Sequence, residues 1–215
     1  MPDLDSFLYG RVQDHCAGQS SSESELLRDL RRESRLTLIH PRMLSGPFQG
    51  RVLAMLSRMI KPKRILELGT YSGYSALCLS EGLAPGGELI TIEKDDELER
   101  IQSTFLDRSE NADRIKRIQG DAMEVLQELD GPFDLIFLDA DKERYPAYFP
   151  RLKTLLTTGG FILADNMLWD GKVMEEAHDE RTSAIEELMQ LVKDDETMEQ
   201  VLLPIRDGLL MAQKL

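Results

Sequence analysis

Cysteine and histidine are scarce in this sequence, which has two cysteines and three histidines among 215 residues. Cys16 and Cys78 lie in dissimilar surroundings without the spacing of metal ligands, so we expect neither a disulfide framework nor a zinc site. No apolar run approaches the roughly 20 residues that span a bilayer, and the first ten residues carry acidic charges where a signal peptide carries basic ones. The sequence therefore predicts a soluble, cytoplasmic protein with no membrane partner.

Positive charge is also in deficit, with 26 Lys and Arg against 39 Asp and Glu and a formal net charge of -13. A strongly negative protein repels phosphates, which argues against broad nucleic-acid binding. One stretch departs from this balance, because four arginines recur at helical spacing: Arg28, Arg31, Arg32 and Arg35. This stripe is either a solvated face, balanced by Glu25, Asp29 and Glu33, or a contact for an anionic substrate or a partner subunit.

The length predicts a single domain, residues 1–215, with an N-terminal helical segment (1–45) and a core (46–215). Ser22 and Glu25 have the spacing of a capping box ahead of a helical pattern, and a second helix is expected from about Pro47 to Ile60.

From Arg64 onward, apolar strand-like segments alternate with helical stretches: RILELG, ELITIE, IKRIQG, FDLIFLDA and GGFILADN. This alternation predicts a parallel sheet with crossover helices. The end of the chain differs, because VLLPI and LLMAQKL flank Arg206-Asp207-Gly208 and indicate two strands joined by a tight turn. We expect a doubly wound α/β sheet, mostly parallel, with helices on both faces and a C-terminal antiparallel hairpin.

A glycine-containing turn follows the first strand, in RILELGTYSGYSA. In open parallel sheets, ligands bind beyond the carboxyl ends of the strands, where the strand order reverses. The spacing of Gly69 and Gly73 matches neither the dinucleotide fingerprint nor a P-loop. The carboxylate of Glu67 would repel a pyrophosphate but would suit an ammonium or sulfonium group. The turn therefore favours S-adenosylmethionine over NAD.

Acidic residues follow the next two strands. Glu93 ends ELITIE, where a carboxylate can accept hydrogen bonds from both hydroxyls of a ribose. Asp121 follows the third strand, at the level expected for an adenine ring. Each signal alone is weak, because an acid at a strand end commonly caps a helix. The glycine turn, Glu93 and Asp121 together form three signals at successive strand ends, and this combination predicts a nucleoside ligand.

A set of oxygen ligands follows the fourth and fifth strands. Asp139 closes FDLIFLDADK, and Asp165-Asn166 close GGFILADN. If these strands are neighbours, two carboxylates and one amide oxygen converge, a set that suits Mg²⁺, Mn²⁺ or Ca²⁺ rather than zinc. The alternative is that both aspartates cap helices. The Asp-Asn pairing, and Lys142 three positions after Asp139, favour a metal site.

The chain resembles the metal-dependent class I O-methyltransferases, which include catechol and caffeoyl-CoA O-methyltransferases and bacterial relatives. The resemblance spans about Met43 to the C-terminus and rests on ELGTYSGYSAL, ITIEKD, QGDA, FDLIFLDADK, ADNMLWDGKV and IRDGLLMAQK. It implies a Rossmann-like methyltransferase fold. Ala140 and Asp141 stand where the catechol enzyme has a His-Trp pair, so the DADK form looks like the plant and bacterial branch.

The resemblance also implies roles for individual residues. S-adenosylmethionine would be held by Met43, Gly69, Tyr71, Ser75, Glu93 and Ala122, with Glu67 supporting the turn. We also place Gly73, Asp121 and Asp139 among the cofactor-binding residues. Asp139, Asp165 and Asn166 would bind the metal, and Lys142 would be the general base.

The predicted reaction is methyl transfer to a vicinal-dihydroxy aromatic, such as a catechol or caffeoyl compound, and the family implies a homodimer. Trp169, in the loop after the metal ligands, either packs on the flat acceptor beside Lys142 or is a partly exposed core residue. Two alternatives stay open. One is methylation of a hydroxyuridine in tRNA, and the other is a non-catalytic S-adenosylmethionine-binding regulatory protein, which the metal and base residues argue against.

Overall fold

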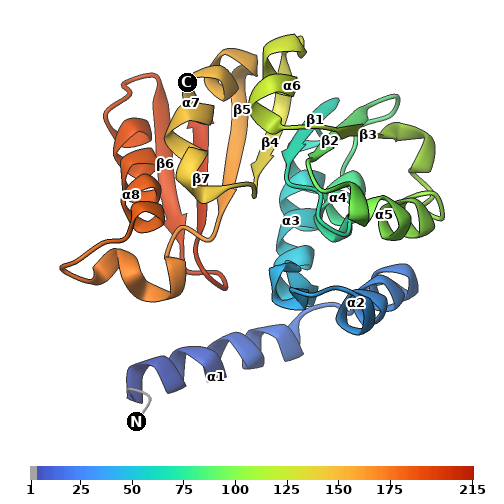
Figure 1. The fold of residues 1–215 in the computed structure, drawn as a ribbon, viewed down its shortest axis with the longest axis horizontal. Coiled ribbons are helices and arrows are strands. Elements are labelled where there is room, and N and C mark those ends of the chain that lie inside the picture. The colour runs from blue at the N-terminus through green and yellow to red at the C-terminus, as the bar shows by residue number, and fades with distance from the viewer. Residues whose placement is uncertain (1–3) are drawn as a thin grey trace.

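A seven-stranded sheet forms the centre of the molecule (Figure 1). The computed structural model describes residues 4–215, with side chains from residue 10 onward. The strands are β1 Arg64–Leu68, β2 Glu88–Glu93, β3 Ile115–Gln119, β4 Phe133–Leu138, β5 Leu156–Asp165, β6 Met198–Leu203 and β7 Leu209–Lys214. They lie in the order β3-β2-β1-β4-β5-β7-β6. Strands β1 to β5 pair in parallel, and β7 is antiparallel to both β5 and β6. The predicted fold class is therefore confirmed.

Helices cover both faces of this sheet. The helices are α1 Leu4–Gln19, α2 Glu25–Thr37, α3 Gly46–Ile60, α4 Tyr74–Ser80, α5 Glu99–Leu106, α6 Ala122–Glu128, α7 Tyr145–Leu155 and α8 Glu180–Lys193. Apolar residues of α2 to α5 form one core with the sheet, and those of α6 to α8 form a second core on the opposite face. Helix α1 extends away from the sheet, at the bottom of Figure 1. No helix in residues 4–215 is both long and apolar enough to cross a membrane.

Strand β1 is buried on both faces, as expected for a central parallel strand. Successive side chains of a strand point to opposite faces. Leu66 and Leu68 therefore join the core with α6 to α8, and Ile65 joins the core with α3 to α5. Glu67 has the same parity as Ile65 and is fully buried, so a carboxyl group lies on the side of the sheet that faces α3 to α5.

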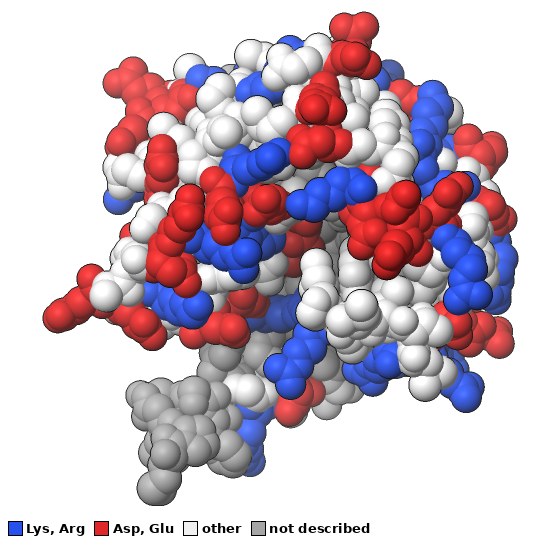
Figure 2. Space-filling model, in the orientation of Figure 1, with Lys and Arg blue, Asp and Glu red and all other residues white. Residues whose placement is uncertain are grey.

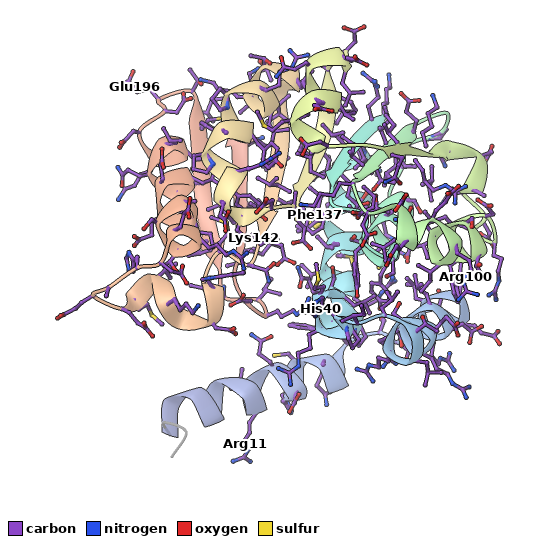
Figure 3. All side chains as sticks on the ribbon, in the orientation of Figure 1. Arg11, His40, Arg100, Phe137, Lys142 and Glu196 are labelled. Atoms are coloured by element: carbon purple, nitrogen blue, oxygen red, sulfur yellow. The ribbon has the colours of Figure 1, made fainter. Side chains whose placement is uncertain are left out.

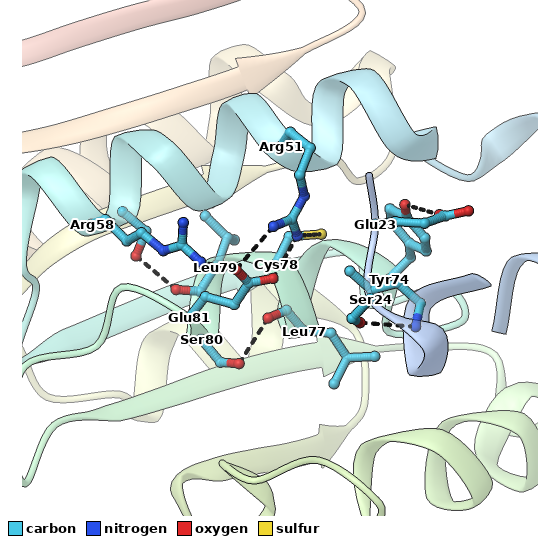
Figure 4. Close-up of polar contacts among 12 residues, drawn as sticks. Glu23, Ser24, Arg51, Arg58, Tyr74, Leu77, Cys78, Leu79, Ser80 and Glu81 are labelled. Carbon is cyan, nitrogen blue, oxygen red and sulfur yellow. Dashed lines mark hydrogen bonds and ion pairs between the residues drawn. The ribbon is translucent and has the colours of Figure 1, made fainter. Parts of the chain in front are cut away.

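Polar contacts connect helix α4, which follows the glycine turn, to α3 and to the segment just before α2 (Figure 4). The Tyr74 hydroxyl donates to Glu23 Oε2 at 2.7 Å. Arg51 and Arg58 of α3 both reach Glu81, at the end of α4, with N···O distances of 2.5 and 2.6 Å. These contacts hold the helix that carries the turn against the rest of the fold.

Two local predictions need correction. Ser24, and not Ser22, caps α2, because the capping residue directly precedes the first helical residue, and its hydroxyl accepts a bond from the Leu27 N–H at 3.3 Å. Strand β5 begins at Leu156 rather than at Gly159, because Leu156 already pairs with Phe133. A register shift after Phe133 lets the strand continue through its two glycines. The predicted helix near Pro47 and the C-terminal hairpin are confirmed.

The strand order reverses between β1 and β4, and there the ends of these strands touch. The Asp139 N–H donates to the Leu68 carbonyl at 2.9 Å. Gly69 has φ of +94°, and a Cβ on this residue would lie 2.0 Å from the Asp139 carbonyl oxygen. Only glycine permits this approach, since any side chain would collide with backbone that cannot move aside.

We expect Gly69→Ala to lower the free energy of unfolding by more than about 2 kcal/mol, because backbone strain of roughly 1 to 2 kcal/mol adds to the collision with Asp139. Gly86→Ala is the matched control, since Gly86 has φ of +73° and a methyl group added there would meet no atom within 4 Å. Urea unfolding of both variants measures the difference. Equal losses would show that the close approach costs nothing.

Candidate functional site

A cleft opens at the carboxyl ends of the parallel strands, between the sheet and the N-terminal helices. On the face shown in Figure 2 the molecule is hollowed here, with acidic and basic side chains interspersed around the hollow. Lys142 and His40, both labelled in Figure 3, line it. Ten predicted site residues also line the cleft or its floor: Met43, Gly69, Tyr71, Glu93, Asp121, Ala122, Asp139, Lys142, Asn166 and Trp169.

Four predicted residues lie outside the cleft lining. Ser75 lines a small recess beneath the glycine turn, together with Gly69 and Tyr71. Gly73 precedes α4 with φ of +89°, and Glu67 and Asp165 are buried behind the surface. The structure therefore brings the predicted set together, with ten residues on the cleft lining and four directly behind it or beneath the turn.

Hydrogen bonds to the end of β2 hold the glycine turn in place. The N–H groups of Gly69 and Thr70 both donate to the Ile92 carbonyl, at 3.0 and 3.2 Å. The Tyr71 N–H donates to Glu93 Oε2 at 2.7 Å, although Tyr71 has a strained φ of +48°. The glycine turn is thus hydrogen-bonded directly to Glu93, the residue predicted to bind the ribose.

Glu67 supports the turn from below. Burial, the largest effect, raises the pKa of Glu67 to about 8, although the neighbouring hydroxyls of Ser75 and Thr91 act in the opposite direction. The carboxyl group shares a hydrogen bond of 2.5 Å with Thr91, whose hydroxyl lies 2.5 Å from that of Thr70. At pH 7 the Glu67 carboxyl group is therefore mostly protonated, and the negative charge expected from the sequence to suit a sulfonium is largely absent. The contribution of Glu67 is to hold β1, β2 and the turn together.

Glu93 and Asp121 both engage backbone groups at the mouth of the cleft. Glu93 Oε1 accepts from the N–H groups of Lys94 and Asp95, at 2.9 and 3.0 Å. Asp121 accepts from the Met123 N–H at 2.9 Å as the cap of α6, and Arg144 donates to its other oxygen at 2.7 Å. The helix-cap alternative is therefore correct for Asp121, which nonetheless lines the cleft.

Lys142 is buried and lies against Asp139 and Tyr145. Its Nζ donates to Asp139 Oδ1 at 2.7 Å and to the Tyr145 hydroxyl at 2.6 Å. The Tyr145 hydroxyl in turn donates to the Leu138 carbonyl at 3.0 Å. Burial alone would lower the pKa of Lys142, but the negative charge of Asp139, with smaller effects of Tyr145 and Asp165, raises it above its usual value. Lys142 is thus an ammonium ion whose direction is fixed by two partners.

Asp165 and Asn166 complete the candidate metal set. Burial, and then the charge of Asp139, raise the pKa of Asp165 to about 6. The Tyr145 hydroxyl, which contacts Lys142, also lies 3.3 Å from the Asp165 carbonyl oxygen, so Asp165 lies next to the pair of Lys142 and Asp139. The helix-cap alternative is wrong for Asp139 and Asp165. The short helices that follow them have Asp141 and Leu168 at their N-cap positions, and neither helix has a side-chain cap.

The donor set has the chemistry of a hard-cation site. Among the side chains that the structure describes, residues 10–215, no group of three or more His, Cys, Asp and Glu is placed to hold a metal ion. The candidate set instead combines two carboxylates with the amide oxygen of Asn166, all oxygen donors of the kind that Mg²⁺, Mn²⁺ and Ca²⁺ prefer. A bound divalent cation would also offset the repulsion between Asp139 and Asp165. The residues present therefore fit such an ion.

Trp169 combines features of both interpretations made from the sequence. The residue lines the cleft, and its ring also packs against the core formed with α6 to α8. Its Nε1 is buried without a hydrogen-bond partner, and its φ is +48°. A strained tryptophan in this position is held by the surrounding loop, since such backbone persists only where other contacts fix it.

The arginine stripe on α2 reaches the cleft in part. Arg31 and Arg35 line it, and Arg31 also pairs with Glu23 at 2.5 Å. Asp29, expected to balance the stripe, pairs instead with Arg108 at 3.4 Å. A contact of the stripe with an anionic substrate or a partner subunit stays a prediction.

Sequence reasoning missed three residues of the site. Tyr145 directs Lys142 from three positions later, a helical spacing that could have been noticed. Gln49, buried on α3, accepts a hydrogen bond from Arg206 at 3.2 Å. Asp207 was interpreted only as part of a turn, and nothing in the sequence places that turn beside Asn166. Strand pairing alone brings it there.

Comparison with known proteins now decides the family. Residues 17–215 match the protein family described as O-methyltransferase. The chain belongs to the O-methyltransferase family. This membership confirms the resemblance noted in the sequence and the expectation that the chain is a methyltransferase.

Two relatives illustrate the range of this O-methyltransferase family. A catechol O-methyltransferase from Niastella koreensis is 38% identical over 140 residues, which cover 63% of this chain and 63% of that protein. The match therefore spans less than two thirds of that relative's length. A caffeoyl-CoA O-methyltransferase from Populus kitakamiensis is 33% identical over 207 residues, covering 90% of this chain and 88% of that protein.

Solved structures share the fold over nearly the whole chain. The O-methyltransferase from Bacillus cereus, determined in complex with SAH, superposes with a TM-score of 0.88 at 28% identity, covering 95% of this chain and 97% of that chain. The sheet of this chain ends in the antiparallel strands β7 and β6, whereas a plain dinucleotide-binding sheet ends on another parallel unit.

We expect the stability of this O-methyltransferase to depend on pH through Glu67. Because the folded pKa of about 8 exceeds the unfolded value of 4.5, the contribution of Glu67 is fully present below pH 4.5 and is lost as the pH rises to about 8. Glu67→Gln cannot ionise, so its stability should not fall with this ionisation. Between pH 5 and pH 9, the free energy of unfolding of the variant should therefore rise by roughly 2 to 5 kcal/mol relative to that of the wild type.

Urea unfolding across this pH range provides the measurement. Glu187→Gln, an exposed position on α8, is the control and should follow the wild type. Parallel profiles for the wild type and Glu67→Gln would contradict the burial argument.

Proposed function

We propose that this chain transfers a methyl group from S-adenosylmethionine to one hydroxyl of a vicinal-dihydroxy aromatic, with a divalent cation at Asp139, Asp165 and Asn166. Family membership and the SAH complex of a similar structure support the methyl donor. The observation that carries the proposal is the buried Lys142, 2.7 Å from Asp139, on the same cleft as the glycine turn. A module that only bound the donor would have no use for that lysine.

The glycine turn and the ends of β2 and β3 are proposed to hold the donor. Glu93 accepts backbone bonds with both oxygens and keeps further lone pairs toward the cleft, where ribose hydroxyls can donate. Met43, half-exposed beside Gly69 and Tyr71, offers an apolar surface to the methionine end. Asp121 and Ala122 line the cleft where the base would lie.

The acceptor hydroxyl must be ionised before it can attack a methyl group. A free phenol has a pKa near 10, so keeping it ionised at pH 7 costs about 4 kcal/mol. A divalent cation, when bound, lowers the pKa of a coordinated hydroxyl and offsets the negative charge of the carboxylates. We propose that Lys142 accepts the proton at Nζ once that negative charge is offset, since the carboxylates otherwise keep it an ammonium ion.

Positioning is proposed to contribute more than proton transfer. Holding the acceptor oxygen in line with the methyl group can supply roughly 7 to 11 kcal/mol, whereas a general base contributes a factor of about 10² to 10⁴. In this chain the flat face of Trp169 supports the acceptor and the Tyr145 contact keeps Lys142 directed toward it. The homodimer and the cytoplasmic location stay predictions.

We expect Asp165→Ala to abolish methyl transfer and Lys142→Ala to leave about 10⁻² to 10⁻⁴ of the wild-type rate, because the first removes positioning and the second removes only a proton acceptor. The assay follows labelled methyl transfer from S-adenosylmethionine to caffeic acid with Mg²⁺ or with EDTA. EDTA should stop transfer by the wild type while leaving donor binding intact.

Asp195→Ala is the control, because Asp195 is a carboxylate that holds backbone at the distant start of β6. Equal, mild losses in Asp165→Ala and Lys142→Ala would contradict the mechanism. Transfer that survives EDTA would contradict the cation, and absence of transfer with intact donor binding would contradict the acceptor and favour tRNA or a regulatory role.

A further inference from the structure

The turn between β6 and β7 packs directly onto the loop that carries Asn166. The Met167 N–H donates to the Gly208 carbonyl at 3.0 Å, and the Leu168 N–H donates to the Asp207 carbonyl at 2.8 Å. A Cβ on Gly208 would lie 2.6 Å from Leu168 Cγ and 2.7 Å from its backbone nitrogen. The two backbones are therefore in contact, with no room for a side chain between them.

The carboxylate of Asp207 holds two groups of this loop at once. One oxygen accepts from the Asn166 side-chain amide at 3.3 Å, and the other accepts from the Asp170 N–H at 2.7 Å. A carboxylate can only accept, so the Asn166 NH₂ must face Asp207. The Asn166 carbonyl oxygen is then the atom left for a ligand. Asp207 thereby determines which end of the amide faces the cleft.

Backbone strain is concentrated at this junction. Asn166, Trp169 and Asp170 have φ of +61°, +48° and +53°, and Arg206 on the facing turn has φ of +54°. Such conformations are strained and persist where surrounding contacts hold them. The bonds of Asp207 to both ends of the loop are contacts of that kind.

The residue before Asp207 connects the same turn to helix α3. Arg206 Nη1 donates to Oε1 of the buried Gln49 at 3.2 Å, and its Nη2 donates to the Arg42 carbonyl at 2.6 Å. Hydrogen bonds therefore hold this turn on two sides, from Asp207 to the loop that carries Asn166 and from Arg206 to α3 and the segment before it.

We propose that Asp207 is a positioning residue of the cation site, which orients the Asn166 amide so that its oxygen faces the cation and fixes the Trp169 loop in the same geometry. The inference rests on the proposed function, because it assumes that a divalent cation binds Asn166. It assigns to the C-terminal hairpin a role in the site beyond closing the sheet.

The test is a titration of the purified full-length protein with Mn²⁺ alone, followed by electron paramagnetic resonance of the free ion, in the absence of substrates. Asp207→Ala should weaken Mn²⁺ binding about 10- to 100-fold, the usual effect of removing a partner that orients a metal ligand. Asp207→Asn keeps one accepting oxygen and should lie between Asp207→Ala and the wild type. Binding of S-adenosylmethionine should stay within about twofold in all variants.

Asp195→Ala is the matched control. Asp195 accepts from the Thr197 N–H at 3.0 Å and from its hydroxyl at 2.7 Å, so it stabilises the opposite end of the same hairpin away from the site. If Asp207 had only a structural role, Asp207→Ala and Asp195→Ala would both lower thermal stability and leave Mn²⁺ affinity unchanged. That result would overturn the positioning role of Asp207 but not the proposed function. Failure of the wild type to bind Mn²⁺ would overturn the cation of the proposed function, and the inference with it.

Discussion

The contact between the turn after β1 and the end of β4 is the constraint on which the site depends. Gly69 lies so close to the Asp139 carbonyl that a methyl group would overlap it. This approach places the proposed donor-binding turn beside the carboxylate and lysine that follow β4. A methyl group and its acceptor must meet within a few ångströms, since near-attack distances are about 3 to 3.5 Å. The strand order supplies that proximity before any side chain contributes.

Buried charge is the second feature of the site. Asp165 and Lys142 are taken out of water at the rim of the sheet, where each would be costly alone. Asp139 partners the lysine at 2.7 Å while its charge opposes ionisation of Asp165. The set therefore has an excess of negative charge that a divalent cation would balance. Glu67 avoids the same problem differently, by remaining mostly protonated at neutral pH.

Much of the fold could be predicted because it follows local rules. Apolar runs indicated the strands, and the residues after strand ends indicated Asp139, Asp165 and Asn166 as neighbours once a parallel sheet was assumed. The errors are equally local in origin. Several serines could cap α2, and the two glycines of β5 suggested a start that strand pairing overrides. The charge of Glu67 was misjudged because burial cannot be measured from the residue alone.

Residue types and spacing determined the sheet, the glycine turn and the oxygen set, because each depends on neighbours within one strand and its following loop. Only the tertiary structure decided that Asp207 bonds Asn166, 41 positions earlier, and that Tyr145 and Asp139 together direct Lys142. It also decided which acids keep their charge, since the pKa of Asp165 and of Glu67 depends on burial. The physical reason is that pairing of distant strands and exclusion of water arise only after the chain has folded.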